Sequence, residues 1–401
     1  MLTTVQTWVG RAARPFSRTS YNTMAHERMR FYTLVGLALF KLLNYFGSVW
    51  DIQWHATIGR DSLFIPPHLV AGAGFFAGLS LALAAVTYET WLDRQEARMQ
   101  GVVRWGGITV APAILSATLF YLTAIFCTFL DDQWHRRFGL DSTLWSPPHL
   151  LIGLAMAGVD FSVLLGLAAS AKRLGLKLNW RSPYLWGLVL VGAFAFESAN
   201  YWTSEAFIFG FRYGGAGLLG MLFPILVGSL YPFGLVLSLR LAGRYWVVVP
   251  ILAVALVLQY AATGLSQVLF GILKPVSLLE TFILQNPLST VALARRFGIE
   301  NGFVGLIGIQ QAWVMWLSAI PLGLVALLDL LPAARRRMLL AAPVYSLSLV
   351  VSSYFFFQGM PVMAKYGTTA LDVIGAACLA GAGGLLFGWL GWRLAGLVVK
   401  E

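Results

Sequence analysis

The chain has 401 residues, of which 58% are hydrophobic and only 11% are charged. Soluble globular domains carry about 25% charged residues. The low charged fraction, together with the mean hydropathy of +0.74, therefore excludes an ordinary soluble globular domain. The net charge of +11 does not indicate a nucleic-acid partner, since the basic residues are spread over short connecting segments. The composition therefore predicts a polytopic membrane protein in contact with the lipid bilayer.

Apolar stretches that could cross a bilayer recur along the whole chain, at about 20 residues per helical span. The pattern predicts an all-α transmembrane helix bundle of ten spans. These are expected near 31–50, 68–90, 107–130, 149–171, 184–203, 215–239, 245–268, 311–331, 338–358 and 371–395. Lys and Arg are concentrated in alternate connecting segments, which the positive-inside rule assigns to the cytoplasm. We therefore expect the N-terminus and the C-terminus to be cytoplasmic.

Three regions follow from this organisation. Residues 1–30 are expected to form a basic cytoplasmic tail on anionic lipid, although their Arg and Ser content also resembles a transit peptide. Residues 31–171 contain a duplicated helical hairpin, and residues 172–401 add further transmembrane helices of unassigned role. Cys127 and Cys378 fall inside predicted spans, which indicates small core residues and no cysteine-based metal site.

The duplicated hairpins carry nearly the same polar linker. Residues 51–69 read DIQWHATIGRDSLFIPPHL, and residues 131–150 read DDQWHRRFGLDSTLWSPPHL. Together the two copies contain four of the five histidines of the chain. Under the predicted topology both linkers face the extracytoplasmic side.

In the first copy, Asp51 and His55 are four residues apart, which places both side chains on one face of a helix. His68 follows Pro66-Pro67, and prolines suit the first turn of a helix because their missing N–H would be unpaired there. His68 is therefore expected at the mouth of the second span. The hairpin should bring all three side chains to the same depth.

The second copy predicts the same group from Asp131, His135 and His149, with Asp132 as an adjacent carboxylate that could replace Asp131. Two imidazoles and one carboxylate leave an open coordination position and suit copper, zinc or iron. The alternative is a set of hydrogen-bonded anchors at the membrane interface beside Trp54 or its counterpart in the second copy. Ionisable clusters at membrane depth are costly and usually functional, which favours the metal sites.

Other polar residues have candidate supporting roles. Asp61 and Asp141 could accept the second ring N–H of a ligand histidine, or simply cap the following turn. Glu197 is a candidate additional ligand or proton carrier, with interfacial solvation as the alternative. Lys41 and Asp160 lie at equal predicted depth below the linkers, which predicts a buried ion pair.

The first linker also resembles a known family. It has the pattern D-x-x-W-H-x-T-I-x-R-D-x-x-F-x-P-x-H, carried by Asp51, Trp54, His55, Thr57, Ile58, Arg60, Asp61, Phe64, Pro66 and His68. This pattern resembles the C subunit of the copper membrane monooxygenases, the particulate methane and ammonia monooxygenase family. The resemblance implies that Asp51, His55 and His68 hold copper. A second family site has Asn where this chain has Asp131, followed by histidines at the spacing of His135 and His149.

The resemblance covers about residues 40–150 and implies a membrane metalloprotein, most simply a copper protein, that oxidises a small apolar substrate with O2. It also implies partner subunits or a separate electron donor, and an oligomer is compatible with it. Two other functions remain open from the residues alone. One is uptake or storage of copper or zinc, and the other is a non-catalytic subunit with a metal-braced hairpin.

Overall fold

The computed structural model describes residues 18–59, 62–95, 99–139, 145–215, 217–287, 292, 313–331, 337–358 and 367–399. Over these residues the chain is almost entirely α-helical, as the composition predicted. One short antiparallel hairpin interrupts the helices, formed by β1 (Val103–Trp105) and β2 (Ile108–Val110). Gly106 and Gly107 connect its strands with positive φ angles of 58° and 79°, which suit a tight two-residue turn.

The duplicated sequence folds into two helical hairpins. The first consists of α2 (Arg18–Thr57) and α3 (Pro66–Arg94), and the second of α4 (Pro112–Phe138) and α5 (Pro147–Arg173). Helix α2 therefore begins within the predicted basic tail. Prolines occupy the first turn of α3 and of α5. This position suits proline because the N–H that it lacks would have no partner within the helix there.

The rest of the described chain forms longer helices and several short ones. In chain order these are α6 (Pro183–Gly214), η1 (Gly217–Gly220), α7 (Leu222–Val227), α8 (Leu230–Ala242), α9 (Val248–Leu273), α10 (Leu279–Gln285), α12 (Trp313–Leu317), α13 (Ala319–Leu327), η2 (Leu328–Leu330), η3 (Met338–Leu340), α15 (Ala341–Gln358) and α17 (Ala370–Ala395).

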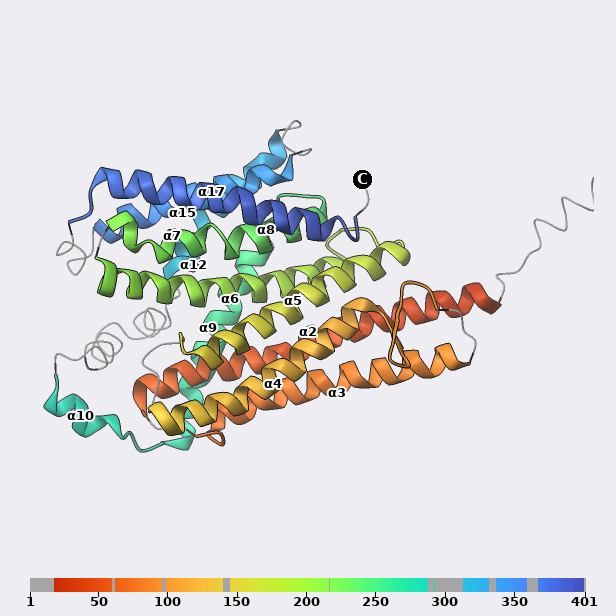
Figure 1. Ribbon diagram of the computed structural model, residues 1–401, viewed down its shortest axis with the longest axis horizontal. Coiled ribbons are helices and arrows are strands. Elements are labelled where there is room, and N and C mark those ends of the chain that lie inside the picture. The colour runs from red at the N-terminus through yellow and green to blue at the C-terminus, as the bar shows by residue number, and fades with distance from the viewer. Residues whose placement is uncertain are drawn as a thin grey trace, which may run out of the picture.

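Most of the long helices run side by side along the longest axis of the molecule (Figure 1). Helices α2, α3, α4 and α5 form one layer, and α7, α8, α15 and α17 form the other. Helix α6 lies between them, because it packs against α5 on one side and against α7 and α8 on the other. Helix α9 joins the layers through contacts with α2, α6 and α13.

Two large apolar cores fill the bundle, and the larger one extends from the hairpin layer to α8, α9 and α17. The larger core joins α2 to α5 with α6 around residues such as Leu37, Tyr121 and Leu167, all of which are inaccessible to solvent. The second core surrounds Phe223 and Tyr345 in the other layer. The duplicated hairpins therefore form a well-packed unit that can hold side chains rigidly at the end of the bundle.

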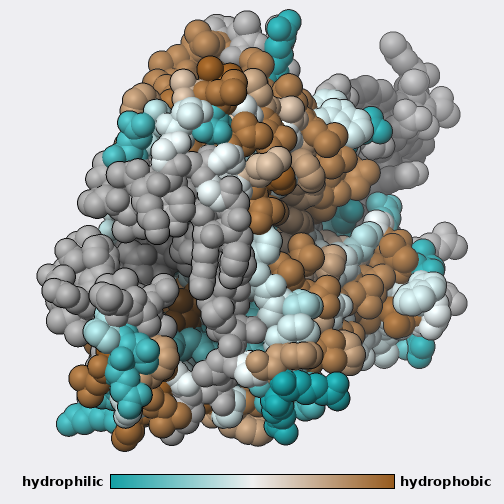
Figure 2. Space-filling model, turned by 60° about the vertical axis from the view of Figure 1, so that its left-hand side comes forward, coloured by the Kyte–Doolittle hydropathy of each residue, from teal (hydrophilic) through white to brown (hydrophobic). Residues whose placement is uncertain are grey.

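Eight helical segments of the described chain are long and apolar enough to cross a membrane, which supports the predicted membrane protein but not ten spans. The predicted span 184–203 lies on α6, where Glu197 and Asn200 lower the hydropathy. Within the predicted span 311–331 the described residues form α12, α13 and η2, and the apolar segment Val314–Leu330 is shorter than the eight candidate spans. Many exposed side chains are hydrophobic, and they cover much of the face in Figure 2, as contact with lipid requires.

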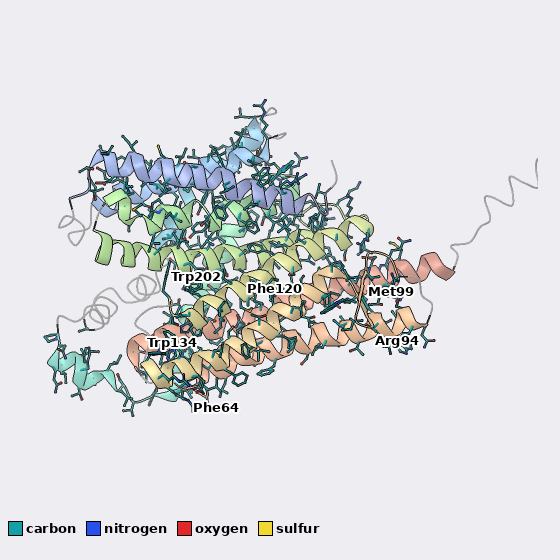
Figure 3. The ribbon with its side chains drawn as sticks, in the orientation of Figure 1. Phe64, Arg94, Met99, Phe120, Trp134 and Trp202 are labelled. Carbon is teal, nitrogen blue, oxygen red and sulfur yellow. The ribbon has the colours of Figure 1, made fainter. Side chains whose placement is uncertain are left out.

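The two ends of the hairpin layer differ in character. Arg94 and Met99 lie at one end, while Phe64 and Trp134 lie at the other, where both repeated linkers are found (Figure 3). At the first end, buried Arg30 makes hydrogen bonds of 2.7 and 3.1 Å to the two carboxylate oxygens of buried Glu89. Glu89 also accepts the backbone N–H of Ala111 at 2.7 Å, so this ion pair ties α2, α3 and the start of α4 together.

Candidate metal centre

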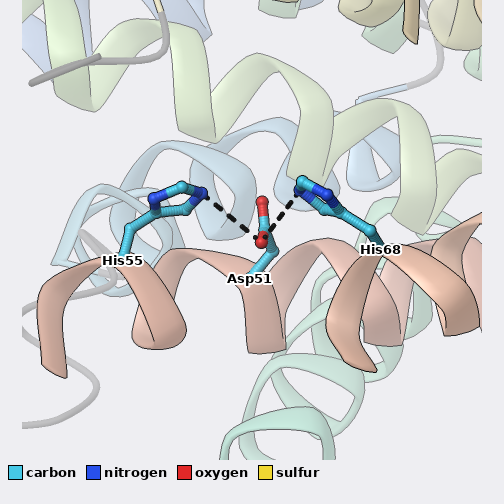
Figure 4. A group of neighbouring side chains, drawn as sticks. All are labelled: Asp51, His55 and His68. Carbon is cyan, nitrogen blue, oxygen red and sulfur yellow. Dashed lines mark ion pairs between the residues drawn. The ribbon is translucent and has the colours of Figure 1, made fainter. Parts of the chain in front are cut away.

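The first repeated linker brings Asp51, His55 and His68 together. Asp51 and His55 lie one turn apart on α2, and His68 projects from the first turn of α3. The Nε2 atoms of His55 and His68 lie 3.5 and 3.2 Å from Asp51 Oδ1, and both rings are directed at the carboxylate (Figure 4). One ligand atom from each residue lies within 4.8 Å of the other two. This is the group that the sequence predicted.

The hydrogen bond on the far side of the His68 ring determines which nitrogen carries a proton. His68 Nδ1 lies 2.9 Å from the backbone carbonyl oxygen of Ser62, which can only accept. Nδ1–H must therefore donate, and in the neutral ring Nε2 presents a lone pair. That lone pair faces the Asp51 carboxylate, an arrangement that a cation held between the two groups would stabilise.

The second linker forms an equivalent group from Asp131, His135 and His149. His135 Nε2 lies 3.5 Å from Asp131 Oδ1, and His149 Nε2 lies 3.4 Å from Asp131 Oδ2. The ligand atoms again lie within 4.8 Å of one another. His149 Nδ1 lies 2.9 Å from the hydroxyl of Ser146, the residue that precedes the two prolines of α5. This contact fixes the orientation of the ring.

The two groups are neighbours. Between the groups, the ring centroids of His55 and His135 lie 6.4 Å apart. Within the groups, the centroids lie 6.3 Å apart for His55 and His68, and 5.6 Å apart for His135 and His149. The four imidazoles therefore form a continuous row from one hairpin to the other. The spacing of the sequence repeats did not predict this proximity.

Both groups line one cavity of about 860 Å³. Its polar wall contains both carboxylates and three of the histidines, namely Asp51, His68, Asp131, His135 and His149. Its apolar wall includes Phe64, Phe75, Phe76, Ile125, Phe129, Ile152 and Leu278. A cavity with a few convergent polar groups among aromatic and aliphatic side chains has the character of a binding site for a small apolar molecule.

The C-terminal part of the chain contributes to this cavity through the segment between α9 and α10. The backbone N–H of Leu278 donates to the carbonyl oxygen of Ile58 at 2.9 Å, and the Ser277 hydroxyl donates to that of Thr57 at 2.7 Å. A side chain at Gly59, whose φ is +69°, would collide with Leu279. Sequence analysis missed this contribution, because no repeat or motif marks residues 277–279.

The structure assigns different surroundings to the other carboxylates considered. Asp132 forms an ion pair with Arg136 at 2.9 Å at the cavity wall and does not replace Asp131. Glu197 belongs to neither three-residue group and contacts Tyr45. Asp61 and Asp141 lie outside the described residues. For the described rings of His68 and His149, the contacts at the second nitrogen are the Ser62 carbonyl and the Ser146 hydroxyl.

Lys41 and Asp160 form the predicted buried ion pair, with exposed side-chain fractions of only 6% and 1%. Lys41 Nζ also donates to the backbone carbonyl of Met156 at 3.2 Å and lies 5.3 Å from the centre of the Phe194 ring. Lys41 is one helical turn before Asn44, which lines the cavity. Lys41 itself is not among the residues that line the cavity.

Comparison of the chain with protein-family models, with curated proteins and with solved structures finds no match.

Proposed function

We propose that the chain is an integral membrane metalloprotein in which Asp51, His55 and His68 hold one metal ion, and Asp131, His135 and His149 hold another. The observation that carries this proposal is the convergence of two imidazoles on one carboxylate in each group, within 4.8 Å. Three protein ligands leave room for an exogenous ligand. The donor sets fit copper, zinc or iron, and the resemblance of the first linker favours copper.

The reaction we propose is the oxidation of a small apolar substrate by O2. One oxygen atom would enter a C–H bond and the other would form water, with two electrons and two protons taken from an external donor. Bound copper would supply the redox chemistry that activates O2. The residues of the chain would supply the rest: Phe76, Phe129 and Ile152 offer an apolar surface to the substrate beside the polar wall.

The buried ion pair also supports catalysis over passage of a metal ion through the protein. A transport path would need polar ligands that lead inward from the linkers. The buried charged groups Lys41 and Asp160 lie below the linkers, and the Asp160 carboxylate is already engaged by Lys41. This pair is therefore a poor ligand set for a passing cation, which favours catalysis over transport.

Under this proposal the linkers face the extracytoplasmic side, as the distribution of Lys and Arg predicts. Purified protein in lipid nanodiscs, loaded with copper and supplied with a reductant, should convert small alkanes or alkenes to oxygenated products. His68→Ala and His149→Ala test each group separately. Copper retained at stoichiometric levels without any oxygenated product would contradict the enzymatic function while leaving metal binding intact.

A further inference from the structure

A second polar cluster lies between α2, α6 and α9, apart from the metal groups. Asn44 lines the cavity, whereas the adjacent Tyr45 extends toward α6 and α9. The Tyr45 hydroxyl lies 2.9 Å from Glu197 Oε1 and 2.9 Å from Gln259 Oε1. Glu197 and Gln259 are 1% and 0% exposed, so solvent satisfies neither side chain.

The number of protons available to these contacts is limited. The Tyr45 hydroxyl has a single proton, whereas the oxygens of Glu197 and Gln259 at 2.9 Å are a carboxyl oxygen and an amide oxygen, and the Tyr201 hydroxyl is a further neighbour. An amide oxygen carries no proton. If Tyr45 donates to Gln259, the contact with Glu197 requires a proton on the carboxyl group. A protonated Glu197 donates to Tyr45, which donates to Gln259, and both contacts are satisfied.

The orientation of the Gln259 amide supports this arrangement. Thr263 donates its hydroxyl proton to the Gln259 backbone carbonyl at 2.8 Å, so its oxygen can only accept from the side chain of Gln259. The Gln259 Nε2 group faces that oxygen at 3.5 Å. The Tyr201 hydroxyl lies 3.4 Å from Oε1, where it can donate. Rotating the amide would place two acceptors, Oε1 and the Thr263 oxygen, against each other.

The electrostatic surroundings also favour a neutral carboxyl group. Among the described residues, Glu197 forms no ion pair, and the buried Lys41 ammonium on α2 is engaged with Asp160 from α5. The titratable groups around Glu197 are Tyr45 on α2, Tyr201 on α6 and Tyr231 on α8. An isolated buried carboxylate is so costly that such a group takes up a proton instead.

Other buried atoms extend the polar cluster along α6. Glu197 Oε2 and both amide atoms of Asn200, one turn further on, have no hydrogen-bond partner among the described residues. Asn200 is 0% exposed. Unpartnered polar groups at this depth are expensive to retain, which is typical of a site that exchanges a ligand rather than of a packing position.

We propose that Glu197 is a proton-binding site inside the bundle, separate from the metal groups, which carries a proton near neutral pH and exchanges it with solvent. The ligand is the proton itself. Binding forms the O–H bond of the carboxylic acid, and release returns a carboxylate and a proton. Tyr45, Gln259 and Asn200 are positioning residues, because they orient the carboxyl group or provide hydrogen-bonding capacity next to it.

Infrared spectroscopy of the whole protein in lipid tests this proposal. At neutral pH the spectrum should contain the carbonyl band of a protonated carboxylic acid, which moves to lower frequency in D2O and again after labelling with ¹³C-glutamate. The Glu197→Gln variant should lose the band. Asp160→Asn is the matched control, because it removes a buried carboxyl group that has a lysine partner, and the band should remain.

Isotope labelling keeps the test decisive even if a variant does not fold. The absence of a ¹³C-glutamate-sensitive acid band in the wild-type protein at neutral pH would overturn the proposal. So would a band that does not respond to D2O over hours, because the site would not exchange its proton. The Glu197→Gln variant should keep the wild-type metal content, and a proportionate loss of metal would overturn the separation of the two sites.

Discussion

The rings of His55 and His135 lie with their centroids 6.4 Å apart, although 80 positions of sequence separate the two residues. Each belongs to a different three-residue group, and each is one turn from its own carboxylate. The two copies of the repeat therefore place their candidate ligands against each other at the end of the hairpin layer. Any pair of ions held by these groups would share one cavity.

This proximity predicts magnetic interaction between two bound Cu(II) ions. Electron paramagnetic resonance of the copper-loaded protein should show a signal broadened by coupling. His68→Ala should remove one ion and leave the sharper signal of an isolated Cu(II) with about half the total copper. Two sharp signals that add independently in the wild type would contradict the interaction.

The Ser146 hydroxyl should affect the metal affinity of the second group only, the one formed by Asp131, His135 and His149. Because it contacts the Nδ1 atom of His149, Ser146→Ala removes the group that orients this ring. Loss of such an outer partner typically weakens metal binding by about 10- to 100-fold. Competition with a chelator of known affinity measures the change, which should be confined to one of the two ions.

Ser182→Ala is the matched control for this substitution. Ser182 also precedes a proline at the start of a helix, but its hydroxyl accepts the backbone N–H of Tyr184 and lies far along the chain from both groups. Its removal should cost about 1 kcal/mol of stability through the lost cap and leave both metal affinities unchanged. Equal effects of the two substitutions on metal affinity would contradict the role of Ser146.

The Lys41–Asp160 pair should behave as a coupled unit. Asp160→Ala leaves a buried ammonium group without its partner and should destabilise the protein by about 3–5 kcal/mol. Adding Lys41→Met removes that charge and should recover most of the loss. Thermal unfolding in detergent measures both variants, and independent, additive decreases in the midpoint would show that the two residues do not depend on each other.

The buried ion pair of Arg30 and Glu89 should contribute more to the free energy of unfolding than the exposed pair of Arg104 and Asp93. Glu89→Ala removes the acceptor that Arg30 shares with the Ala111 N–H, while Glu27 still faces the guanidinium, and should cost about 1–3 kcal/mol. Asp93→Ala removes a partner of Arg104, whose side chain is 55% exposed, and should barely change the unfolding midpoint. Similar midpoints for the two variants would contradict this contrast.

Both three-residue groups could be predicted from the sequence because local rules determine their geometry. The spacing of Asp51 and His55 fixes a shared helix face, and Pro66 fixes where the next helix begins. The Lys41–Asp160 pair was predictable for a similar reason, since helical rise converts residue counts into depth. The three-residue groups depend only on the geometry within one hairpin. The ion pair depends only on the two residues lying at the same depth in two similar hairpins.

The number of spans and the outline of the cavity could not be obtained in this way. Hydropathy predicted a span over residues 311–331, whereas the described apolar helical segment there, Val314–Leu330, is shorter than a full span. The cavity depends on how helices that are distant in sequence pack together. No local sequence pattern therefore indicated that Leu278 forms part of its wall. The contact of Tyr45 with Glu197 joins residues 152 positions apart and was invisible for the same reason.

Elemental analysis of the protein, purified from its membrane without chelators, tests the central claim most directly. The wild-type protein should contain two transition-metal ions per chain, predominantly copper. His68→Ala and His149→Ala should each retain one, and the double variant should retain none. A wild-type protein without stoichiometric transition metal, or one whose metal content is unchanged in the double variant, would contradict the assignment of these residues as ligands.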